Sequence, residues 1–475
     1  MIVKKKYSLG IDIGTNGVRV GIFDLKGNAA VFQEEPLAMS FPQPGWAEQE
    51  PAAWWRAACA ASQAALAKCG IPPEDIIGIG LDATCCTVVA VNEKLEPLRP
   101  AIMWMDVRAQ QQAERISATG HAALKYNGFG PVSAEFFPCK ALWLKENEPE
   151  TYHRTAWFME CTDYISYLLT GRLALNINTV TMRWYYDSKN GGWNRDFYET
   201  IGLGDVFAKL PDSVLNIGER LGNLTKDAAA AMGLLEGTPV AVGISDAHAG
   251  VIGLNVVEPG RTALITGTSH LHEGLTETEV HGMGFFGTFP DAVIRGVNLI
   301  EGGQTSTGAI VKWFMQNIGR ACQGEADERG ISLYDLFEEK AAQIEIGSEG
   351  LMALDYFQGN RTPYTDGAVR GMLYGLTLKH TPAHIYRAIL EGICYGTQHV
   401  LETFRKAGYN TTALYASGGA TKNKLWVQMH ADVSNVPVYI PAEKEAPCLG
   451  SAILAAVCAG AYETIQQAAG EMYAM

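Results

Sequence analysis

The sequence lacks the spaced cysteines that build a disulfide framework or a zinc site. Its ten cysteines have no regular spacing, no Cys-x-x-Cys pair occurs, and Cys85 and Cys86 are adjacent. This usage is typical of a reducing compartment, because secreted domains favour paired cysteines at set spacings. We therefore expect a cytoplasmic protein.

Long apolar runs and an excess of basic charge are also missing. The longest apolar run, residues 449–461, is short and rich in small side chains, whereas a membrane-spanning helix needs about 20 apolar residues. The 37 basic and 51 acidic side chains give a net charge of −14. A negative net charge disfavours nucleic acid and anionic membranes as partners, so neither partner is expected, although a local cationic site for phosphate is still compatible with it.

The chain is too long for one hydrophobic core. Single cores stop growing beyond about 250–300 residues, and this chain has 475. We expect two domains, residues 1–245 and 246–475. The junction is placed where a buried strand passes into a helix that begins at Asp246.

The first patterned stretch, residues 7–24, predicts a β-hairpin with one face cleared for a ligand. Apolar side chains alternate with Ser8, Gly10 and Asp12, so the second face carries only small groups and one carboxylate. Asn16-Gly17 is typical of a type I′ turn, since both residues tolerate positive φ. A plain buried hairpin with a turn-capping Asp is the alternative.

The loop of this hairpin suits a phosphate. Backbone N–H groups around Gly14, Thr15 and Asn16 can approach a phosphate closely, and Asp12 could hold its metal ion. The stretch Gly267-Thr268-Ser269 repeats the pattern of a strand that ends in Gly-Thr-polar. Two such loops suggest two related lobes that both contact one nucleotide.

A second apolar run, residues 76–91, predicts buried strands with a polar interruption at residues 82–84. Gly78-x-Gly80-x-x-Ala83 nominally matches a dinucleotide fingerprint, which would indicate a nicotinamide-dependent oxidoreductase. That fingerprint needs a helix directly after its glycines, whereas residues 88–91 continue as a strand. The pattern therefore disfavours the oxidoreductase.

Other stretches predict helices and loops around these strands. Helices are expected over residues 51–68, with proline in the first turn, and over 163–170, ended by Gly171. The aromatic-rich stretch 176–193 is expected to be a loop-rich lobe that suits the wall of a sugar pocket. For Asp106 with Arg108, a surface ion pair of little effect on stability is the alternative to a functional role.

Three features of the second half bear on chemistry. Asp246 follows the carboxyl end of a strand, where ligand-facing groups gather in open α/β sheets; a helix N-cap is its alternative role. His270 and His272 have the same-face spacing of a strand, but a third metal ligand at recognisable spacing is missing. The charged stretch 323–339 predicts a surface insertion.

A strand over residues 413–418 leads into Gly418-Gly419, and Asn423 then enters a helix. Glycines between a strand and a helix let the backbone contact a nucleotide and leave the helix N-terminus facing its phosphates. A tight left-handed turn is the alternative.

These motifs together resemble the FGGY family of carbohydrate kinases over nearly the whole chain. The two Gly-Thr loops resemble the family's phosphate motifs, and residues 417–423 resemble its adenosine motif. Residues 371–376, then seven residues, then 384–391 fit the C-terminal signature. The N-terminal signature near Pro138 fits only approximately. The resemblance implies an α/β, two-domain, actin-like and ribonuclease-H-like fold with the active site in the inter-domain cleft.

The resemblance also implies a reaction, in which the γ-phosphoryl group of ATP passes to a primary hydroxyl of a sugar or polyol with the help of Mg²⁺. Asp246 matches the general base, which an alcohol needs because it is a poor nucleophile at neutral pH. Asp12 matches the partner of Mg²⁺, directly or through water. The expected ATP and phosphate ligands are Gly14, Thr15, Asn16, Gly267, Thr268, Gly418, Gly419 and Asn423.

Motifs of the ribulokinase branch favour ribulose as the sugar. Glycerol kinases carry an Arg-Glu pair where this chain has Ala83-Thr84, which disfavours glycerol. Arg183 stands where the branch tends to have Lys, and the two are not interchangeable, so xylulose, a tetritol or another polyol are alternatives. The expected substrate-binding residues are Ala83, Thr84, Asp106, Arg183, Asp246, Glu301 and Gln304.

A catalytically silent sugar-binding protein is the alternative outside this enzyme class. Such a protein would be expected to lose Asp12 or Asp246, and both are present. No oligomeric state follows from the sequence, and a homodimer is kept as the candidate assembly.

Overall fold

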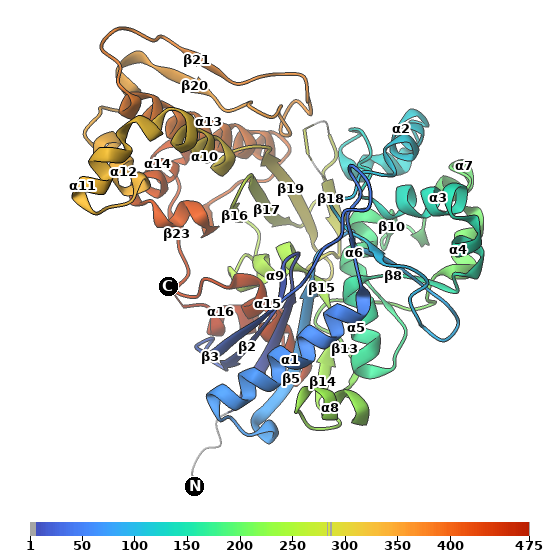
Figure 1. Ribbon diagram of the computed structural model, residues 1–475. Coiled ribbons are helices and arrows are strands. Elements are labelled where there is room, and N and C mark those ends of the chain that lie inside the picture. The colour runs from blue at the N-terminus through green and yellow to red at the C-terminus, as the bar shows by residue number, and fades with distance from the viewer. Residues whose placement is uncertain (1–5, 283, 286, 475) are drawn as a thin grey trace. The chain divides into compact units, whose positions relative to one another are not determined.

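The computed structural model describes residues 6–282, 284–285 and 287–474 (Figure 1). These residues form two compact units, each of which is described by itself. The helix at Asp246 belongs to unit 1, and the end of the chain returns to unit 1, so this division differs from the predicted boundary after Ser245. Unit 1 holds the described residues of Met1–Val257, Phe289–Leu299 and Glu445–Met475, and unit 2 those of Glu258–Thr288 and Ile300–Lys444.

Unit 1 is built on a mixed sheet. Strand β1 pairs antiparallel with β2 and parallel with β5, in a register that sets Asp12 opposite Asp82. Strand β15 pairs parallel with β5 at Asp82 and Ala83, so β1, β5 and β15 end at the same edge of the sheet. The strand order is β13 (Arg220–Asn223), β14 (Pro239–Ala241), β5 (Ile76–Ala83), β1 (Tyr7–Ile13), β2 (Gly17–Asp24) and β3 (Ala29–Pro36), with β15 (Ile244–Ser245) beside β5.

Helix α15 (Ala446–Cys458) packs against β1 and β5 through glycines. A Cβ atom at Gly10 would lie 2.2 Å from the carbonyl oxygen of Cys448, and one at Gly80 would lie 1.9 Å from that of Ser451. The prediction that this strand face is cleared for a ligand is therefore wrong along most of its length. The small residues of β1 make room for α15, which begins more than four hundred residues further along the chain.

Replacement of Gly80 by alanine is expected to destabilise unit 1. The added methyl group would meet the helical backbone at Ser451, which cannot rotate away as a side chain could. Overpacking of this kind costs about 1–3 kcal/mol of unfolding free energy. Urea unfolding measures the loss.

Gly470 offers a matched control for this change. It lies inside α16 (Ile465–Met472), and a Cβ atom there would meet nothing within 4 Å. Gly470→Ala should leave stability unchanged or raise it slightly, because alanine favours a helix. Equal effects of the two substitutions would contradict the packing argument.

The first hairpin has a different turn from the one predicted. Neither Asn16 nor Gly17 has a positive φ, so the type I′ prediction is wrong. Gly17 belongs to β2, and the loop comprises Gly14, Thr15 and Asn16, closed by a hydrogen bond from Gly14 N to Gly17 O at 3.0 Å. Glycine is needed at position 17 for space, since its Cβ atom would lie 3.0 Å from the Glu35 carbonyl oxygen of β3.

The local predictions for unit 1 hold for several elements. Helix α1 (Pro51–Cys69) has proline in its first turn, and α5 (Cys161–Thr170) ends at Gly171 with φ 70°. Strand β6 (Val88–Val91) follows β5, as predicted, at the place where a dinucleotide fingerprint needs a helix.

The stretch 176–193 is less rich in loops than predicted, and its part in a sugar pocket stays a prediction. It contains α6 (Ile177–Arg183), capped by the Asn176 side chain. The Trp184 ring is fully buried and stacks on Phe137 with centroids 3.6 Å apart. Its aromatic residues belong to the core because the hydrophobic effect outweighs the polar character of the surrounding sequence.

The remaining elements of unit 1 surround this framework. They are β4 (Glu48–Gln49), β7 (Ala101–Ile102), α2 (Gln110–Ala118), α3 (Phe137–Asn147), α4 (Pro149–Arg154), β8 (Trp157–Glu160), β9 (Leu175–Asn176), β10 (Tyr186–Asp187), β11 (Gly192–Trp193), α7 (Arg195–Thr200), β12 (Val214–Leu215), α8 (Lys226–Met232) and α9 (Asp246–Gly253).

Unit 2 repeats the opening pattern of unit 1. Strand β16 (Arg261–Thr266) pairs antiparallel with β17 (His270–Thr276) and parallel with β22 (Ala413–Gly418), as β1 does with β2 and β5. A loop of three residues again joins the two strands, closed by Gly267 N to Ser269 O at 2.9 Å. The predicted echo between the two Gly-Thr loops is therefore confirmed.

The sheet of unit 2 has the order β18-β19-β17-β16-β22-β23. Its other elements are β18 (Gly287–Pro290), β19 (Asn298–Gln304), α10 (Gly308–Asn317), α11 (Gln323–Arg329), α12 (Leu333–Ala342), β20 (Met352–Leu354), β21 (Met372–Tyr374), α13 (Pro382–Lys406), α14 (Lys424–Ser434) and β23 (Val438–Tyr439).

Three histidines meet in the interior of unit 2. His270 and His272 on β17 are fully buried, and His430 of α14 lies with its ring centroid 5.4 Å from that of His270. All six ring nitrogens are without a hydrogen-bond partner among the described residues. The ring nitrogens of the three histidines do not all lie within 4.8 Å of one another, so the structure gives no support to a metal ion held by them. Burial lowers the pKa of His272 to about 3 and that of His430 to about 4.

Among the described residues, no helix combines the length and the apolar character needed to cross a membrane. All ten cysteines carry free thiols.

Candidate functional site

Three carboxylates gather at the carboxyl edge of the unit 1 sheet. Asp12 ends the polar face of β1, Asp82 lies opposite it on β5, and Asp246 directly follows β15. Asp246 is the first residue of α9, with Ser245 in the N-cap position, so the N-cap alternative for Asp246 is wrong. The Asp246 side chain is partly exposed, and its Oδ1 accepts a hydrogen bond from Ala247 N at 2.7 Å. A carboxylate held in this way can accept a proton from a ligand.

Burial sets the charge of the other two carboxyl groups. It raises the pKa of Asp12, against the lowering effect of a hydrogen bond from Asp82 and of the Arg19 guanidinium. Burial and the Asp12 charge raise the pKa of Asp82 well above its usual range, while the Ser451 hydroxyl donates to Asp82 Oδ2 at 2.7 Å. Asp82 was not among the predicted site residues. A carboxylate inside a buried strand is the signal that could have found it.

Arg19 faces more acidic groups than it can neutralise. Its guanidinium contacts Glu34 at 3.0 Å, Asp12 at 3.6 Å, and Glu445. Three carboxylates around one cation leave an excess of negative charge beside the Gly-Thr loop. A phosphate bound there would need a further cation.

The loop of the first hairpin is held from outside while its N–H groups stay available. Gln49 Nε2 donates to Thr15 O at 2.8 Å, and Trp104 Nε1 donates to Thr15 Oγ1 at 3.0 Å. Among the described residues, the backbone N–H groups of Thr15 and Asn16 have no acceptor. A Cβ atom at Gly14 would come no closer than 3.5 Å to its neighbours, which indicates open space for a ligand. The geometry suits the predicted phosphate loop.

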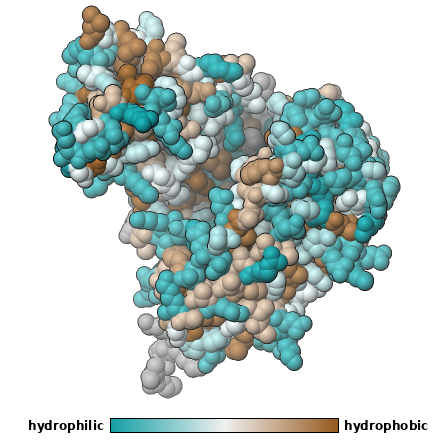
Figure 2. Space-filling view, in the orientation of Figure 1, coloured by the Kyte–Doolittle hydropathy of each residue, from teal (hydrophilic) through white to brown (hydrophobic). Residues whose placement is uncertain are grey.

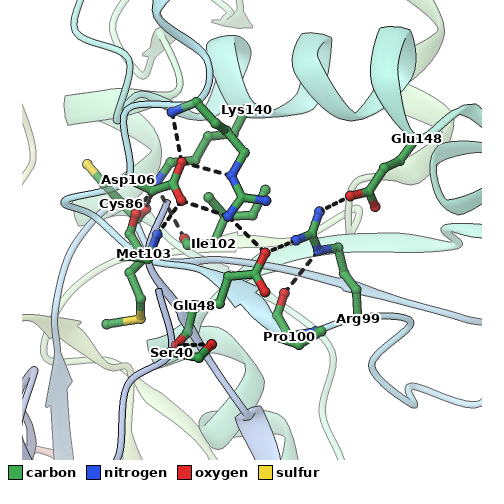
Figure 3. Close-up of polar contacts among 12 residues, drawn as sticks. Ser40, Glu48, Cys86, Arg99, Pro100, Ile102, Met103, Asp106, Lys140 and Glu148 are labelled. Atoms are coloured by element: carbon green, nitrogen blue, oxygen red, sulfur yellow. Dashed lines mark hydrogen bonds and ion pairs between the residues drawn. The ribbon is translucent and has the colours of Figure 1, made fainter. Parts of the chain in front are cut away.

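A network of buried charges anchors the segment that carries Trp104 (Figure 3). Lys140 Nζ donates to the carbonyl oxygens of Met103 at 2.8 Å, Ile102 at 3.3 Å, and Cys86. Burial lowers the pKa of Lys140. The ammonium group thus ties residues 102–103 to the stretch that follows β5.

The same network continues through Asp106, Arg108, Glu48 and Arg99 (Figure 3). Arg108 contacts Asp106 at 2.7 Å and Glu48 at 2.8 Å, and both the Arg108 and Asp106 side chains are fully buried. Arg99 links Glu48 to Glu148. The alternative of a surface ion pair is therefore wrong, because these charges are paired and desolvated together.

Asp106 has a structural role in this network. Its carboxylate accepts from Ala47 N and from three nitrogens of Arg108, so both oxygens are occupied within the protein. A direct contact of Asp106 with a sugar stays a prediction.

The other predicted sugar residues of unit 1 lie near the strand edge. Ala83 is fully buried, and Thr84 Oγ1 pairs with Thr87 Oγ1 at 2.9 Å. Arg183 ends α6 with its guanidinium 5.1 Å from the Phe136 ring centroid and 5.2 Å from that of Phe289.

Helix α6 is tied to the start of α9. Asn178 Oδ1 accepts from Ser245 N at 3.1 Å, and its Nδ2 lies 2.9 Å from His248 Nδ1. The helix that carries Arg183 is thereby linked to the residue before Asp246.

A pocket of about 810 Å³ lies within unit 2. Gly267, Thr268, Gly419 and Asn423 of the predicted nucleotide motifs all line it, and Gly418 adjoins it in sequence. Two lysines and two acidic residues also line the pocket, namely Lys312, Lys422, Asp335 and Glu338.

Close backbone approaches shape the glycine end of this pocket. A Cβ atom at Gly308 would lie 2.2 Å from Gly267 O. Gly418 has a φ of 91°, and its Cβ atom would lie 1.9 Å from Thr266 O, so only glycine fits there. Asn423 caps α14, since Oδ1 accepts from Trp426 N at 2.8 Å. These contacts set exposed backbone beside a helix N-terminus, an arrangement that binds phosphates.

Glu301 and Gln304 lie on β19 and are buried. Gln304 Nε2 donates to Asp355 at 2.7 Å and to Ile393 O at 2.9 Å, and its Oε1 accepts from Thr397 at 2.9 Å. The amide group of Gln304 is thus used within unit 2, and its contact with a sugar stays a prediction.

The stretch 323–339, predicted as a surface insertion, is largely exposed but also contributes to the core of unit 2. It forms α11 and most of α12, and Phe337 of α12 is fully buried in the core of unit 2. Residues of α12 line the pocket. The capping box of Ser332 and Asp335 before an apolar pair is a signal that could have identified α12.

Comparison with known proteins assigns the family. The N-terminal domain of the FGGY family of carbohydrate kinases matches residues 7–253, and the C-terminal domain of that family matches residues 262–459. A ribulokinase of Anoxybacillus flavithermus is 36% identical, covering 98% of this chain and 89% of the relative. An FGGY carbohydrate kinase domain-containing protein of Xenopus laevis is also 36% identical, covering 98% of this chain and 91% of the relative.

The fold agrees with this assignment. The crystal structure of xylulose kinase from Rhodospirillum rubrum superposes with a TM-score of 0.87 at 25% identity, covering 98% of this chain and 92% of that one. The predicted α/β, two-domain, actin-like class is confirmed. With both family domains matched in order along the sequence, the chain belongs to the FGGY family of carbohydrate kinases.

Proposed function

We propose that this protein transfers the γ-phosphoryl group of ATP to a primary hydroxyl of a ketopentose, with ribulose as the preferred sugar. The observation that carries the proposal is Asp246, a partly exposed carboxylate at the sheet edge from which the first Gly-Thr loop also extends. Relatives named ribulokinase at 36% identity favour ribulose. The replacement of the branch's Lys by Arg183 keeps xylulose and polyols as competing substrates.

Asp246 would act as the general base. A sugar hydroxyl becomes a good nucleophile only as its proton leaves, and a carboxylate within hydrogen-bond reach can accept that proton as the new P–O bond forms. The free N–H groups of Thr15 and Asn16 would bind oxygens of the transferred phosphoryl group.

The carboxylates at the strand edge fit Mg²⁺. Oxygen atoms are the ligands that this ion prefers, and Asp82 Oδ1 is buried without a hydrogen-bond partner among the described residues. Asp12 and Asp82 would hold the ion directly or through water. When bound, Mg²⁺ neutralises charge on the phosphates.

The remaining site residues are proposed in two groups. Glycines and polar groups of the two Gly-Thr loops and of the unit 2 pocket would bind ATP. Ala83, Thr84, Arg183, Glu301 and Gln304 would surround the sugar, and Asp106 would hold the neighbouring segment in place through its contacts with Arg108.

An ADP-release assay over a panel of sugars tests the proposal. With ATP and Mg²⁺, ribulose should stimulate ADP release most, and xylulose, tetritols and hexuloses less. If none of these sugars raises ADP release above the sugar-free rate, the kinase proposal fails and the silent sugar-binding protein gains support. Strongest stimulation by a tetritol would overturn only the choice of sugar.

We also propose that two copies associate through unit 2. Exposed apolar side chains gather on and beside the two-stranded sheet of β20 and β21, among them Met352, Met372, Tyr374 and Leu376. Figure 2 shows hydrophobic side chains in this part of the unit. Sedimentation velocity over a range of protein concentrations would show a dimer, and a monomer at all concentrations would contradict it.

A further inference from the structure

Helix α12 gives the nucleotide pocket of unit 2 an acidic wall. Tyr334 and Glu338 are four residues apart, so they lie on one face of the helix, and both line the pocket. Leu336 and Phe337 on another face are fully buried in the core, which fixes the orientation of the helix. The carboxylate is therefore placed by packing rather than by a flexible loop.

The part of the pocket lined by glycines suits phosphates. Gly267, Thr268 and Gly308 meet there through close backbone contacts, with Thr268 O accepting from Ala309 N at 3.1 Å. The buried aromatic residues Tyr386 and Trp426 also line the pocket, and the Tyr386 ring packs beside α12, with its centroid 5.6 Å from that of Phe337. A nucleotide whose phosphates contact the glycines would direct its base toward the aromatic residues and α12.

Glu338 is the acidic residue of this wall that can still accept a hydrogen bond from a ligand. Asp335 is engaged in its own capping box, in which it accepts from Ser332 N at 3.3 Å and from Ser332 Oγ at 2.7 Å. Glu338 Oε1 accepts from Leu425 N at 3.2 Å, at the start of α14. This contact anchors one oxygen of the carboxylate, and Glu338 has no other partner among the described residues.

Nearby hydrogen bonds orient the groups around Glu338. Asn423 Nδ2 donates to the Tyr386 hydroxyl at 3.1 Å, and Asn423 Oδ1 accepts from Trp426 N. Burial, and next the charge of Glu338, raise the pKa of Tyr386, so its hydroxyl stays protonated. The wall thus presents an anchored carboxylate beside an apolar ring surface.

We propose that Glu338 accepts a hydrogen bond from the exocyclic amino group of adenine and so makes the pocket select adenine over hypoxanthine and guanine nucleotides. Adenine carries an amino group at position 6, whereas hypoxanthine and guanine carry a carbonyl oxygen there. A carboxylate accepts from the amino group but repels the oxygen, so it discriminates by both attraction and repulsion. This inference rests on the proposed use of ATP, and it names the residue that would choose the base.

Binding of ADP and IDP to the full-length protein without sugar tests this assignment. A hydrogen bond to a charged group contributes about 1.5–3 kcal/mol, so the wild type should bind ADP about 10- to 150-fold more tightly than IDP. In Glu338→Gln the ratio should fall several-fold or more, because a glutamine amide can turn to donate to the oxygen at position 6. Isothermal titration calorimetry gives both dissociation constants.

Glu339→Gln is the matched control. Glu339 is the next residue on α12, is exposed, and pairs with Arg329 at 2.6 Å instead of lining the pocket. The Glu339→Gln variant should keep the wild-type ratio of the IDP and ADP dissociation constants. Circular dichroism and thermal unfolding of both variants would show whether α12 remains folded, and Glu338→Ala, which should also lose the preference, provides a second variant.

The outcomes separate this inference from the proposed function. If the wild type binds ADP and the Glu338 variants keep the wild-type preference for ADP over IDP, the assignment of Glu338 fails while the kinase proposal stands. Equal binding of ADP and IDP by the wild type also overturns it. If the wild type binds neither nucleotide, both proposals fail.

Discussion

Replacement of Asp246 by asparagine is expected to lower kcat by about 10²–10⁴-fold, the range typical of a lost general base. Asparagine has the same shape, and its Oδ1 can still accept from Ala247 N, so α9 should keep its first turn. The amide cannot take the proton of a sugar hydroxyl. ADP release with saturating ribulose and ATP measures kcat, and calorimetry should show nearly unchanged sugar binding.

Asp227 provides the control for this substitution. It is an exposed aspartate in the first turn of α8. Asp227→Asn should turn over at the wild-type rate. Should Asp246→Asn do the same, the general base would have to be sought elsewhere, while the family assignment would be unaffected.

Acidification is expected to destabilise unit 2 through its buried histidines. Their pKa values are lowered on folding, to about 3 for His272 and about 4 for His430, against about 6.5 in the unfolded chain. Between these values the unfolded state binds more protons, so the free energy of unfolding falls as pH falls below 6.5. At pH 5 the loss is about 2 kcal/mol for each of these two histidines.

A single substitution isolates this effect from the other titrating groups. Burial raises the pKa of Asp355 to about 6, so protonation of this carboxyl group stabilises the folded state as pH falls. The measured pH dependence of the stability of unit 2 therefore combines this gain with the losses from the histidines. His430→Leu removes one of the histidines. The stability of this variant relative to wild type, from urea unfolding, should rise by about 2 kcal/mol between pH 7 and pH 5.

His153 is exposed and serves as the comparison. His153→Leu should show the same stability difference from wild type at both pH values. The prediction is wrong if the stability difference between His430→Leu and wild type is the same at pH 7 and pH 5. His430 would then take up its proton equally well in the folded and the unfolded chain.

The nucleotide motifs could be identified from the sequence because they depend on neighbouring residues. A strand that ends in Gly-Thr-polar forms a loop of three residues at both Gly14 and Gly267, and Gly171 ends α5 where expected. Such loops and caps involve hydrogen bonds over a few residues, which local sequence largely specifies. The position of Asp246 after a strand was predictable for the same reason.

The contacts that individual glycines and charged residues make could not be predicted in this way. Gly10 was expected to make room for a ligand, and it makes room for α15 instead. A surface ion pair was one interpretation of Asp106 and Arg108, and they are buried with Glu48. A pattern of alternating residues reveals that a face is small or polar, but the segment that covers it can come from any part of the chain.

The sequence by itself determined the family, the two phosphate loops, the strand that precedes the adenosine motif and the candidate base. Only the tertiary structure decided that Asp82 joins Asp12, that His430 meets His270, and that α12 supplies Glu338 to the nucleotide pocket. These pairs are far apart in the chain, and their meeting depends on how whole elements bury their apolar faces. Local propensities do not encode that packing, because it is a property of the complete core.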